Sequence, residues 1–480
     1  MSVAMSPSRF LIIAAFAGAA VASAPGRAQA FCGFFVAGSD AKLTNNASQV
    51  VLMRKGNRTV MTMSNTYQGP PENFAMVVPV PVVLQKKDVK TLPADVFDRV
   101  DSLSAPRLVE YWERDPCAPI VARDYGVGGL GLIGTGAGGG GKKKDLGVTI
   151  EAKFVAGEYE VLILSATDSS GLETWLRRER YNIPQGAAEA LAPYIRDKSK
   201  FFVAKVNIKK VKRDAQGVVQ LSPLRFSFDA NELRLPVRLG LLNAGGKQDL
   251  IVYVIHPTAR FEVANYANTF IPTNLEVADG VRNNFPAFFA ELFDATVEKM
   301  GRKVVVTEYA WQTNGCDPCP TPPLTPQDLM TLGLDILEAT QQAAPYTSWV
   351  LTRLHTRYSK ETLSEDLIFR EAKPAMGGRA NWNGGNGDEG ATVAGGDGVN
   401  NFQGRYIIRH YWNGPIACKT PAYNQWGGPP GNPDGRPTPT AAKGLATAPR
   451  GKIALKAELR SPVPLLGIPG KPPQRRKGAP

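Results

Sequence analysis

The stretch FCGFFVAGSDAKLTNNASQVVLMRKGNRTVMTMSNTYQGPPENFAMVVPVP, residues 31–81, decides the fold class because it contains three strand-like runs. Gln49–Met53 and Thr59–Thr66 alternate apolar and polar residues on either side of a short polar segment. Gly56 and Asn57 in that segment tolerate the positive φ that a tight reversal needs. The two runs therefore predict a β-hairpin.

The third run, Phe74–Val80, is almost wholly apolar and is typical of a strand that is buried on both faces. Pro79 and Pro81 have no backbone N–H to donate, so they confine the end of this strand to a sheet edge. We expect a β-rich protein from this stretch alone.

The rest of the chain adds further strands and a smaller number of helices. Val148–Phe154 and Glu158–Leu164 predict a second hairpin. Further strands are expected at Phe201–Val211, Val218–Leu221, Leu250–Ile255, Val304–Trp311, Trp349–Tyr358 and Arg405–Trp412, and helices at Pro93–Leu103, Pro106–Arg114, Leu172–Arg180, Ala187–Ile195, Phe285–Met300 and Pro326–Leu337, the last with Thr325 as N-cap. Sequential hairpins with interspersed helices predict an α+β fold of mixed, largely antiparallel sheets with several packed helices.

Four motifs in this chain resemble the exported bacterial DUF2330 family, whose domain has no known function. They are Phe31-Cys-Gly-Phe-Phe-Val-Ala37, Met76-Val-Val-Pro-Val-Pro81, Cys316-Asp-Pro-Cys319 and Leu351-Thr-Arg-Leu-His-Thr-Arg-Tyr358. The resemblance covers most of residues 31–419. It implies secretion and a common fold, and it transfers no catalytic residue.

The first thirty residues have the pattern of a secretory signal peptide. Arg9 supplies the positive charge, Phe10–Val21 the apolar segment and Ala28-Gln29-Ala30 the small-residue cleavage site. Cleavage between Ala30 and Phe31 would release a soluble, periplasmic or secreted chain. The alternative, a membrane anchor, is disfavoured because the apolar segment is too short to span a bilayer of about 30 Å. No other apolar stretch of the chain is long enough to span it either.

Three parts are expected: a signal peptide at residues 1–30, a folded body at 31–419 and a tail at 420–480. The body contains two glycine-rich insertions, 126–141 and 377–398, which predict loops because glycine is costly to order. The tail is rich in proline and basic residues and has few large apolar ones, which is typical of a disordered segment.

The formal net charge of +13 lies mainly in this tail. Without the signal peptide and the tail, the body carries only about +3, so its charge gives no support for nucleic-acid binding. The tail could instead contact a cell-wall polymer or an anionic membrane surface.

The first glycine-rich insertion matches two nucleotide-binding sequence motifs, but its flanking sequence does not match their structural context. Gly129–Gly134 fits the dinucleotide fingerprint, and Gly136–Lys143 approaches a phosphate-binding loop. Both patterns need a preceding strand and a following helix, which the flanking sequence lacks. A solvated loop is the better interpretation, and no cofactor is predicted.

The five cysteines suit an oxidising compartment. We favour a bond between Cys32 and Cys117 and a second bond among Cys316, Cys319 and Cys418. Cys316-Asp-Pro-Cys319 fits a structural disulfide best, because Pro320 prevents the helix that usually activates such a pair. A redox role is the second interpretation. A metal site is the third, and it lacks two further ligands.

The three histidines are His256, His355 and His410, and a histidine-dependent site must use one of them. Arg353, His355 and Arg357 would share one face of a strand. Together with Arg405, Arg409 and His410, they suggest an anion-binding stripe. The plainer interpretation is a solvated outer face of a sheet.

These patterns favour an exported, soluble, non-enzymatic binding or structural component of the envelope. The alternative is an exported hydrolase or a thiol oxidoreductase that uses Cys316 and Cys319. The alternative predicts that substitution of His355, His410 or Cys316 abolishes an activity without unfolding the chain.

Overall fold

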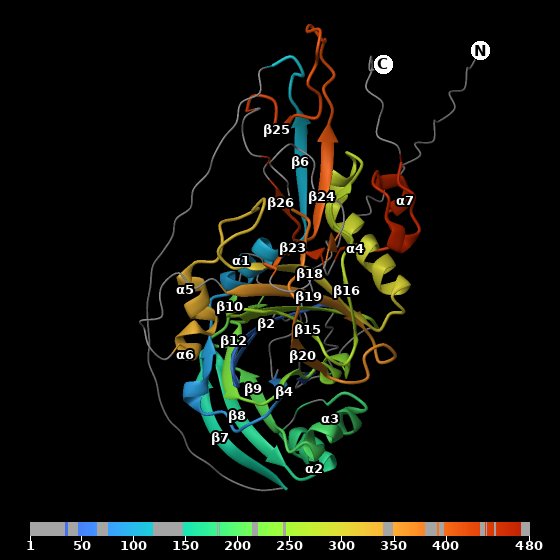
Figure 1. Cartoon of the computed structure of the whole chain (residues 1–480). Coiled ribbons are helices and arrows are strands. Elements are labelled where there is room, and N and C mark those ends of the chain that lie inside the picture. Colours follow the sequence, from blue (N-terminus) through green and yellow to red (C-terminus); the bar gives the residue numbers. More distant parts are fainter. Residues whose placement is uncertain are drawn as a thin grey trace, which may run out of the picture.

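The computed structural model describes residues 34–36, 47–64, 75–118, 147–213, 219–242, 246–338, 349–379, 391–392 and 398–471, apart from 180, 182, 433–436, 438 and 446–447. Its layers are two large β-sheets with helices on their outer faces, and a narrow third sheet extends from one end (Figure 1). The predicted mixed, largely antiparallel α+β architecture is confirmed.

The largest sheet has eleven strands, most of them paired in antiparallel fashion. In order across the sheet they are β22 (Ala391–Thr392), β21 (Met376–Gly377), β23 (Asn401–Gln403), β18 (Val304–Gln312), β19 (Val350–Tyr358), β14 (Gln248–His256), β2 (Ala47–Lys55), β3 (Arg58–Met63), β12 (Leu224–Asp229) and β5 (Val89–Thr91), with β16 (Ala267–Phe270) paired to β18. The predicted hairpin is β2 and β3, which meet at Lys55 and Arg58. Gly56 takes a φ of +56° in the turn between them.

The second sheet has five strands, in the order β1 (Phe34–Val36), β4 (Ala75–Val80), β9 (Lys200–Val206), β8 (Tyr159–Ala166) and β7 (Val148–Ala156). The predicted hairpin at 148–164 is β7 and β8. Strand β4 is buried along its whole length, as its apolar sequence predicted. Because β1 pairs only with Ala75–Val77, the end of β4 that carries Pro79 extends past its neighbour.

The two large sheets pack face to face around the main hydrophobic core. Val50 and Leu52 of β2 point into it and meet Met76 and Val78 of β4, while Phe202 of β9 lies against Phe226. Val51 and Met53 of β2 point to the opposite face. The central strand β2 is therefore buried on both sides.

Helices complete the layers. The outer face of the large sheet is covered by α1 (Asp95–Ser104), α5 (Pro326–Leu329) and α6 (Asp335–Leu337), and that of the second sheet by α2 (Ser169–Arg178) and α3 (Ala187–Arg196). Thr325 caps α5 as predicted. Helix α4 (Val281–Lys299) packs beside β18. Short turns are η1 (Lys86–Asp88), η2 (Arg238–Leu242) and the π-helical η3 (Met330–Leu334).

Three smaller sheets remain. They are β10 (Lys212–Arg213) with β11 (Val219–Gln220); β13 (Leu233–Leu235), β20 (Leu367–Ala372) and β15 (Arg260–Val263); and β17 (Leu275–Glu276), β24 (Arg405–His410), β6 (Arg107–Glu113), β25 (Trp426–Gly427) and β26 (Thr440–Ala441). The long pair β6 and β24 forms the extension at the end of the molecule (Figure 1).

The helix predicted at Pro106–Arg114 was wrong, because this segment is strand β6. Its parallel pairing with β24, 300 residues later in sequence, is a tertiary interaction that local periodicity does not reveal. Val109 and Tyr111 lie on the same side of the strand and form a small cluster with Ile407. The alternation of buried and less buried residues toward its end is that of a strand.

The predicted disorder of residues 420–480 was also wrong for most of that segment. Strands β25 and β26 both pair with β6, and α7 (Leu455–Glu458) and η5 (Pro464–Leu466) follow. Leu445, Leu459 and Ile468 are buried against the cluster that contains α4. A few apolar side chains among prolines are enough here because the body already presents an apolar surface that receives them. Among the described helices, none is long and apolar enough to cross a membrane.

Candidate functional site

The strand β19 carries the predicted stripe, and its residues Arg353, His355 and Arg357 do share one face. Arg353 and His355 are each only 1% exposed. Tyr253 of β14 lies opposite Arg353, and Asp249 of the same strand lies opposite Arg357. The stripe is therefore inside the protein, under α1 and α4, and the expected solvated outer face was wrong.

A β-bulge in β18 supplies the main partner of this stripe. The register between β18 and β19 shifts between Thr307 and Tyr309, so Glu308 is the extra residue. Bulges commonly re-aim a side chain. Here Glu308, fully buried, contacts both Arg353 and His355 with its two carboxylate oxygens.

Arg353 is held by two carboxylates from different elements. Its Nε donates to Glu308 Oε2 at 2.6 Å, and its Nη1 donates to Asp101 Oδ1 of α1 at 2.6 Å. The Tyr253 hydroxyl also donates to Asp101, at 2.6 Å, and the guanidinium lies over the Tyr253 ring. Burial opposes the charge of Arg353, but these partners outweigh burial and raise its pKa.

His355 is held by carboxylates on both ring nitrogens. Nδ1 lies 2.6 Å from Glu308 Oε1 and Nε2 lies 3.2 Å from Asp249 Oδ1. The ring stacks on Phe293 of α4 at 3.9 Å. Burial alone would lower the pKa of His355, but Glu308 and Asp249 outweigh it and raise the pKa. An imidazole with both nitrogens bound to carboxylates has none left to activate a hydroxyl or thiol.

The C-terminal segment completes this cluster. Arg450 donates to Asp249 at 2.8 Å and also to Asp294 of α4, and Arg357 pairs with the same Asp294 at 3.2 Å. We call these eight side chains the central ion-pair network: Asp101, Asp249, Asp294, Glu308, Arg353, His355, Arg357 and Arg450. Four carboxylates balance four cations, so no net positive charge is left for an external anion.

The other two predicted binding residues lie elsewhere, on the β6–β24 extension. Arg409 pairs with Glu276 at 2.6 Å and lies over the Trp426 ring. His410 Nε2 lies 2.8 Å from Glu110, and its ring stacks on Trp112. The structure therefore does not bring Arg409 and His410 together with Arg353, His355 and Arg357 into one stripe.

His256 and Arg405 each have a local role. His256 ends β14 and accepts a hydrogen bond from the Ala259 N–H at 3.1 Å, and burial lowers its pKa. Arg405 is buried, and its guanidinium bonds to Asn274 at 2.7 Å and to the Tyr111 hydroxyl at 2.7 Å.

The described residues contain two disulfides. Cys117 bonds to Cys418, which joins the ends of β6 and β24 across 301 residues, so the favoured Cys32–Cys117 bond was wrong. The pairing of β6 with β24, which are distant in sequence, brings Cys418 close to Cys117. Cys32 lies outside the described residues. Cys316 bonds to Cys319, within the predicted set.

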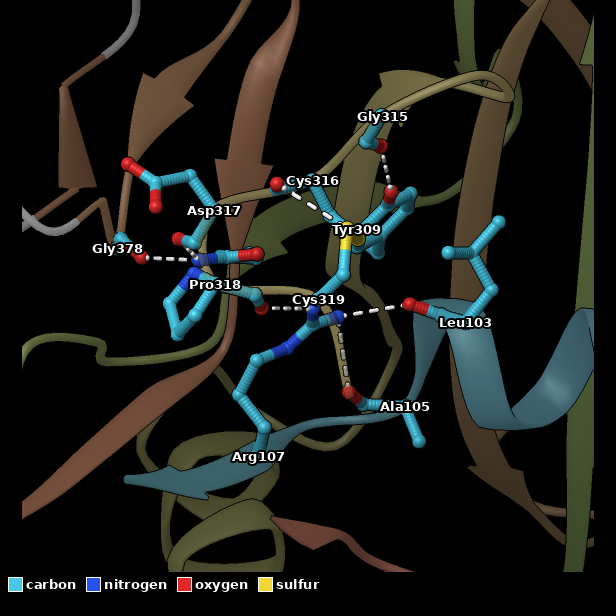
Figure 2. Close-up of a disulfide and its surroundings, with 11 residues drawn as sticks. Leu103, Ala105, Arg107, Tyr309, Gly315, Cys316, Asp317, Pro318, Cys319 and Gly378 are labelled. Carbon is cyan, nitrogen blue, oxygen red and sulfur yellow. Dashed lines mark hydrogen bonds between the residues drawn. A yellow bond between two sulfur atoms is a disulfide. The ribbon is translucent and has the colours of Figure 1, made fainter. Parts of the chain in front are cut away.

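The Cys316–Cys319 bond closes a turn between β18 and α5, and Figure 2 shows the Arg107 guanidinium directly beside this turn. No helix starts at the second cysteine, as Pro320 predicted. Both cysteines are half-buried. Arg107 Nη1 donates to Pro318 O at 3.0 Å, and Nη2 donates to Leu103 O at 2.8 Å.

Two surface hollows are large enough to hold a small ligand. An open groove of about 940 Å³ lies between α4 and the C-terminal segment and is lined by acidic Glu291, Asp294 and Glu298 and by Ile453 and Lys456 among others. A smaller one of about 440 Å³ includes Tyr194, Arg234 and Asp366. Within the described residues, no group of histidine, cysteine, aspartate and glutamate has the arrangement of a metal site. The motifs at 129–143 lie outside the described residues.

The sequence analysis missed the acidic half of the network and Arg107. Glu308 did carry a local sign, because it interrupts the apolar run Val304–Trp311. A charge inside a buried strand needs a partner. Asp101 and Asp249 carried no such sign, and Arg107 lay in the segment that was predicted to be helical.

Comparison with known proteins gives one match. The sequence model of the family DUF2330, described as an uncharacterised protein conserved in bacteria, matches residues 26–370. No curated protein matches the chain, and no solved structure matches it either.

Proposed function

We propose that this chain, which belongs to the bacterial DUF2330 family, is an exported soluble protein that serves as a binding or structural component of the envelope. The signal-peptide pattern at residues 1–30 supports export. The two disulfides support it as well, because such bonds persist in oxidising compartments such as the periplasm.

The central ion-pair network is the observation that carries the non-enzymatic part of this proposal. The sequence singled out Arg353 and His355 as chemistry-bearing residues, and both are buried and bound to carboxylates of the chain. These contacts tie β14, β18, β19, α1 and α4 to one another. The residues therefore hold the layers together, which suits a rigid scaffold better than a reaction centre.

The folded C-terminal segment offers a surface for an anionic partner. Lys443, Lys452 and Lys456 are exposed on it, and Arg450 fixes the segment to the body. A cell-wall polymer or an anionic membrane would meet lysines at fixed positions rather than a free tail. Binding of this kind is electrostatic and weakens as salt rises.

Export is tested by expressing the full-length chain in a bacterium and sequencing the amino terminus of the protein recovered from the periplasm or the medium. The expected terminus is Phe31. Recovery in the cytoplasm with residues 1–30 retained would refute the export proposal.

Surface binding is tested by charge reversal rather than by truncation, because removing residues 420–480 would expose the apolar surface under Leu459 and Ile468. The variant Lys443→Glu, Lys452→Glu, Lys456→Glu should lose at least tenfold in cosedimentation with purified cell wall or with vesicles containing anionic lipid. The control reverses Lys153, Lys205 and Lys360, which are also exposed but lie on other elements. Equal loss in both variants, or in neither, would refute a specific role for the C-terminal segment.

A further inference from the structure

The turn closed by Cys316 and Cys319 is held in place by hydrogen bonds that do not depend on the sulfur atoms. The Tyr309 hydroxyl donates to Gly315 O at 3.2 Å, the Gln403 amide donates to Asp317 O, and Arg107 donates to Pro318 O (Figure 2). Three elements thus fix three carbonyls of the turn. If the disulfide opened, the two sulfurs would stay close enough to close it again.

Arg107 brings a positive charge to this turn, where it donates to a carbonyl oxygen and the Asp317 carboxylate acts on it electrostatically. It is 0% exposed and forms no ion pair among the described residues, where its hydrogen bonds go to carbonyl oxygens. Its Nε has no acceptor among the residues that the structure describes. Burial lowers the pKa of Arg107 to about 10. A buried cation whose direct hydrogen-bond partners are neutral carbonyls is costly, and an anion that formed beside it would reduce that cost.

A thiolate is the anion that this turn can form. In many redox proteins the dipole at a helix N-terminus stabilises the thiolate of a Cys-x-x-Cys pair. This turn has no helix at Cys319, and the Arg107 guanidinium lies beside it instead (Figure 2).

The two disulfides differ in a way that agrees with this assignment. Cys117 and Cys418 are 301 residues apart, so their bond removes much freedom from the unfolded chain, whereas Cys316 and Cys319 are three residues apart and remove little. The short bond therefore contributes less to stability. Neither cysteine is fully buried.

We propose that Cys316 and Cys319 are an exchangeable redox pair, and that Arg107 favours its reduced form by stabilising the thiolate. The partner would be an external dithiol, of a protein or a small molecule.

One thiolate of the partner attacks a sulfur of the pair, the Cys316–Cys319 bond breaks, and the departing sulfur keeps the electron pair as a thiolate beside Arg107. The second thiol of the partner loses its proton and breaks the mixed disulfide. The partner ends as a disulfide and the chain as a dithiol, and two electrons have passed to the chain. This activity goes beyond the proposed binding or structural function.

The test is a redox titration of the full-length oxidised protein in glutathione and dithiothreitol buffers, with the thiols trapped by alkylation and both cysteine pairs followed by peptide mass spectrometry. We expect Cys316–Cys319 to be half-reduced at a thiol-to-disulfide ratio at least tenfold below that needed for Cys117–Cys418, which is about 30 mV for a two-electron couple. Cys117–Cys418 is thus an internal reference for the integrity of the fold.

Three variants separate the charge from the shape of the turn. Arg107→Gln should shift the equilibrium of Cys316–Cys319 at least tenfold toward the disulfide. Gln403→Leu removes an anchor of the same turn without changing its charge and should shift the equilibrium less than threefold. Asp317→Asn removes a negative charge that acts on Arg107 and should shift the equilibrium several-fold toward the dithiol. Asp317 is half-exposed, so this variant keeps the test available if Arg107→Gln does not fold.

The proposal is overturned if both disulfides are reduced together, or if Asp317→Asn leaves the equilibrium unchanged. Those results would mark the Cys316–Cys319 bond as a structural link. They would not affect the export and surface-binding proposals, which depend on other residues.

Discussion

Arg353 and Arg107 are both fully buried arginines on strands, and they are close enough for the charge of Arg353 to lower the pKa of Arg107. Arg353 has two carboxylates, Glu308 and Asp101, and its pKa is raised. Arg107 donates its hydrogen bonds to carbonyl oxygens, and burial lowers its pKa although the Asp317 charge acts to raise it. The difference shows that burial alone does not define the role of a charge. A neutralised guanidinium fixes the fold, whereas an unpaired one can favour an anion.

Removing a carboxylate partner of Arg353 should cause the largest loss of stability. It leaves this buried guanidinium short of a counter-charge, as Arg107 is. Glu308→Ala leaves Arg353 and His355 each short of a partner inside the protein, so we expect a loss of about 3–5 kcal/mol in the free energy of unfolding. Urea denaturation measures it. Glu298→Ala removes an exposed pair with Arg302 and should leave the free energy of unfolding almost unchanged, because water solvates both charges. Similar losses in the two variants would contradict our account of the network.

Replacing each arginine by methionine sharpens the contrast between them. Arg353→Met leaves Asp101 without a cation and Glu308 with His355 alone, whereas Arg107→Met removes a charge whose hydrogen bonds go to carbonyls. We expect Arg353→Met to be the less stable variant by about 2 kcal/mol. Thermal and urea unfolding of the two proteins side by side would show it, and the reverse order would refute the comparison.

Stability should fall as the pH rises above about 6.5, the ordinary pKa of histidine, because the folded protein holds His355 charged. The raised pKa means that the folded state binds this proton more tightly than the unfolded state does. The stabilisation is complete below about pH 6.5 and is lost as the pH passes through the raised folded value.

The slope from this one proton cannot exceed about 1.4 kcal/mol per pH unit. Urea midpoints from pH 5.5 to 9 would measure it. Glu308 and Asp249 contact the ring and favour its proton, and Arg353 shares Glu308 with it. His355→Gln should flatten the profile over this range, and an unchanged slope in that variant would exclude His355 as its source.

The smallest effect is expected at the partly buried pair on the β6–β24 extension, whose two side chains are 19% and 14% exposed. Arg409→Ala removes a contact to Glu276 at 2.6 Å, but water can solvate the carboxylate that remains. We expect a loss of no more than about 1 kcal/mol, and less at high salt. A loss as large as that of Glu308→Ala would show that exposure does not separate the two clusters.

Local sequence predicted much of the fold and little of the site. The hairpins β2–β3 and β7–β8 and the helices α1 to α4 follow from alternation or helical periodicity, which nearby residues set. Strand β6 failed because its partner β24 is distant in sequence. The cations of β19 were identified, but their carboxylates come from four other elements, and no local pattern connects them.

The sequence by itself determined the alternation of Gln49–Met53, the turn at Gly56, the cap at Thr325 and the absence of a helix at Cys319. Each depends on the conformational preferences of a few adjacent residues. Only the tertiary structure decided which carboxylate meets Arg353, that Arg107 meets none, and that Cys117 bonds to Cys418. These outcomes depend on which surfaces the packed sheets bring together, because charge pairing and disulfide bonding act through space, at a range of a few ångströms.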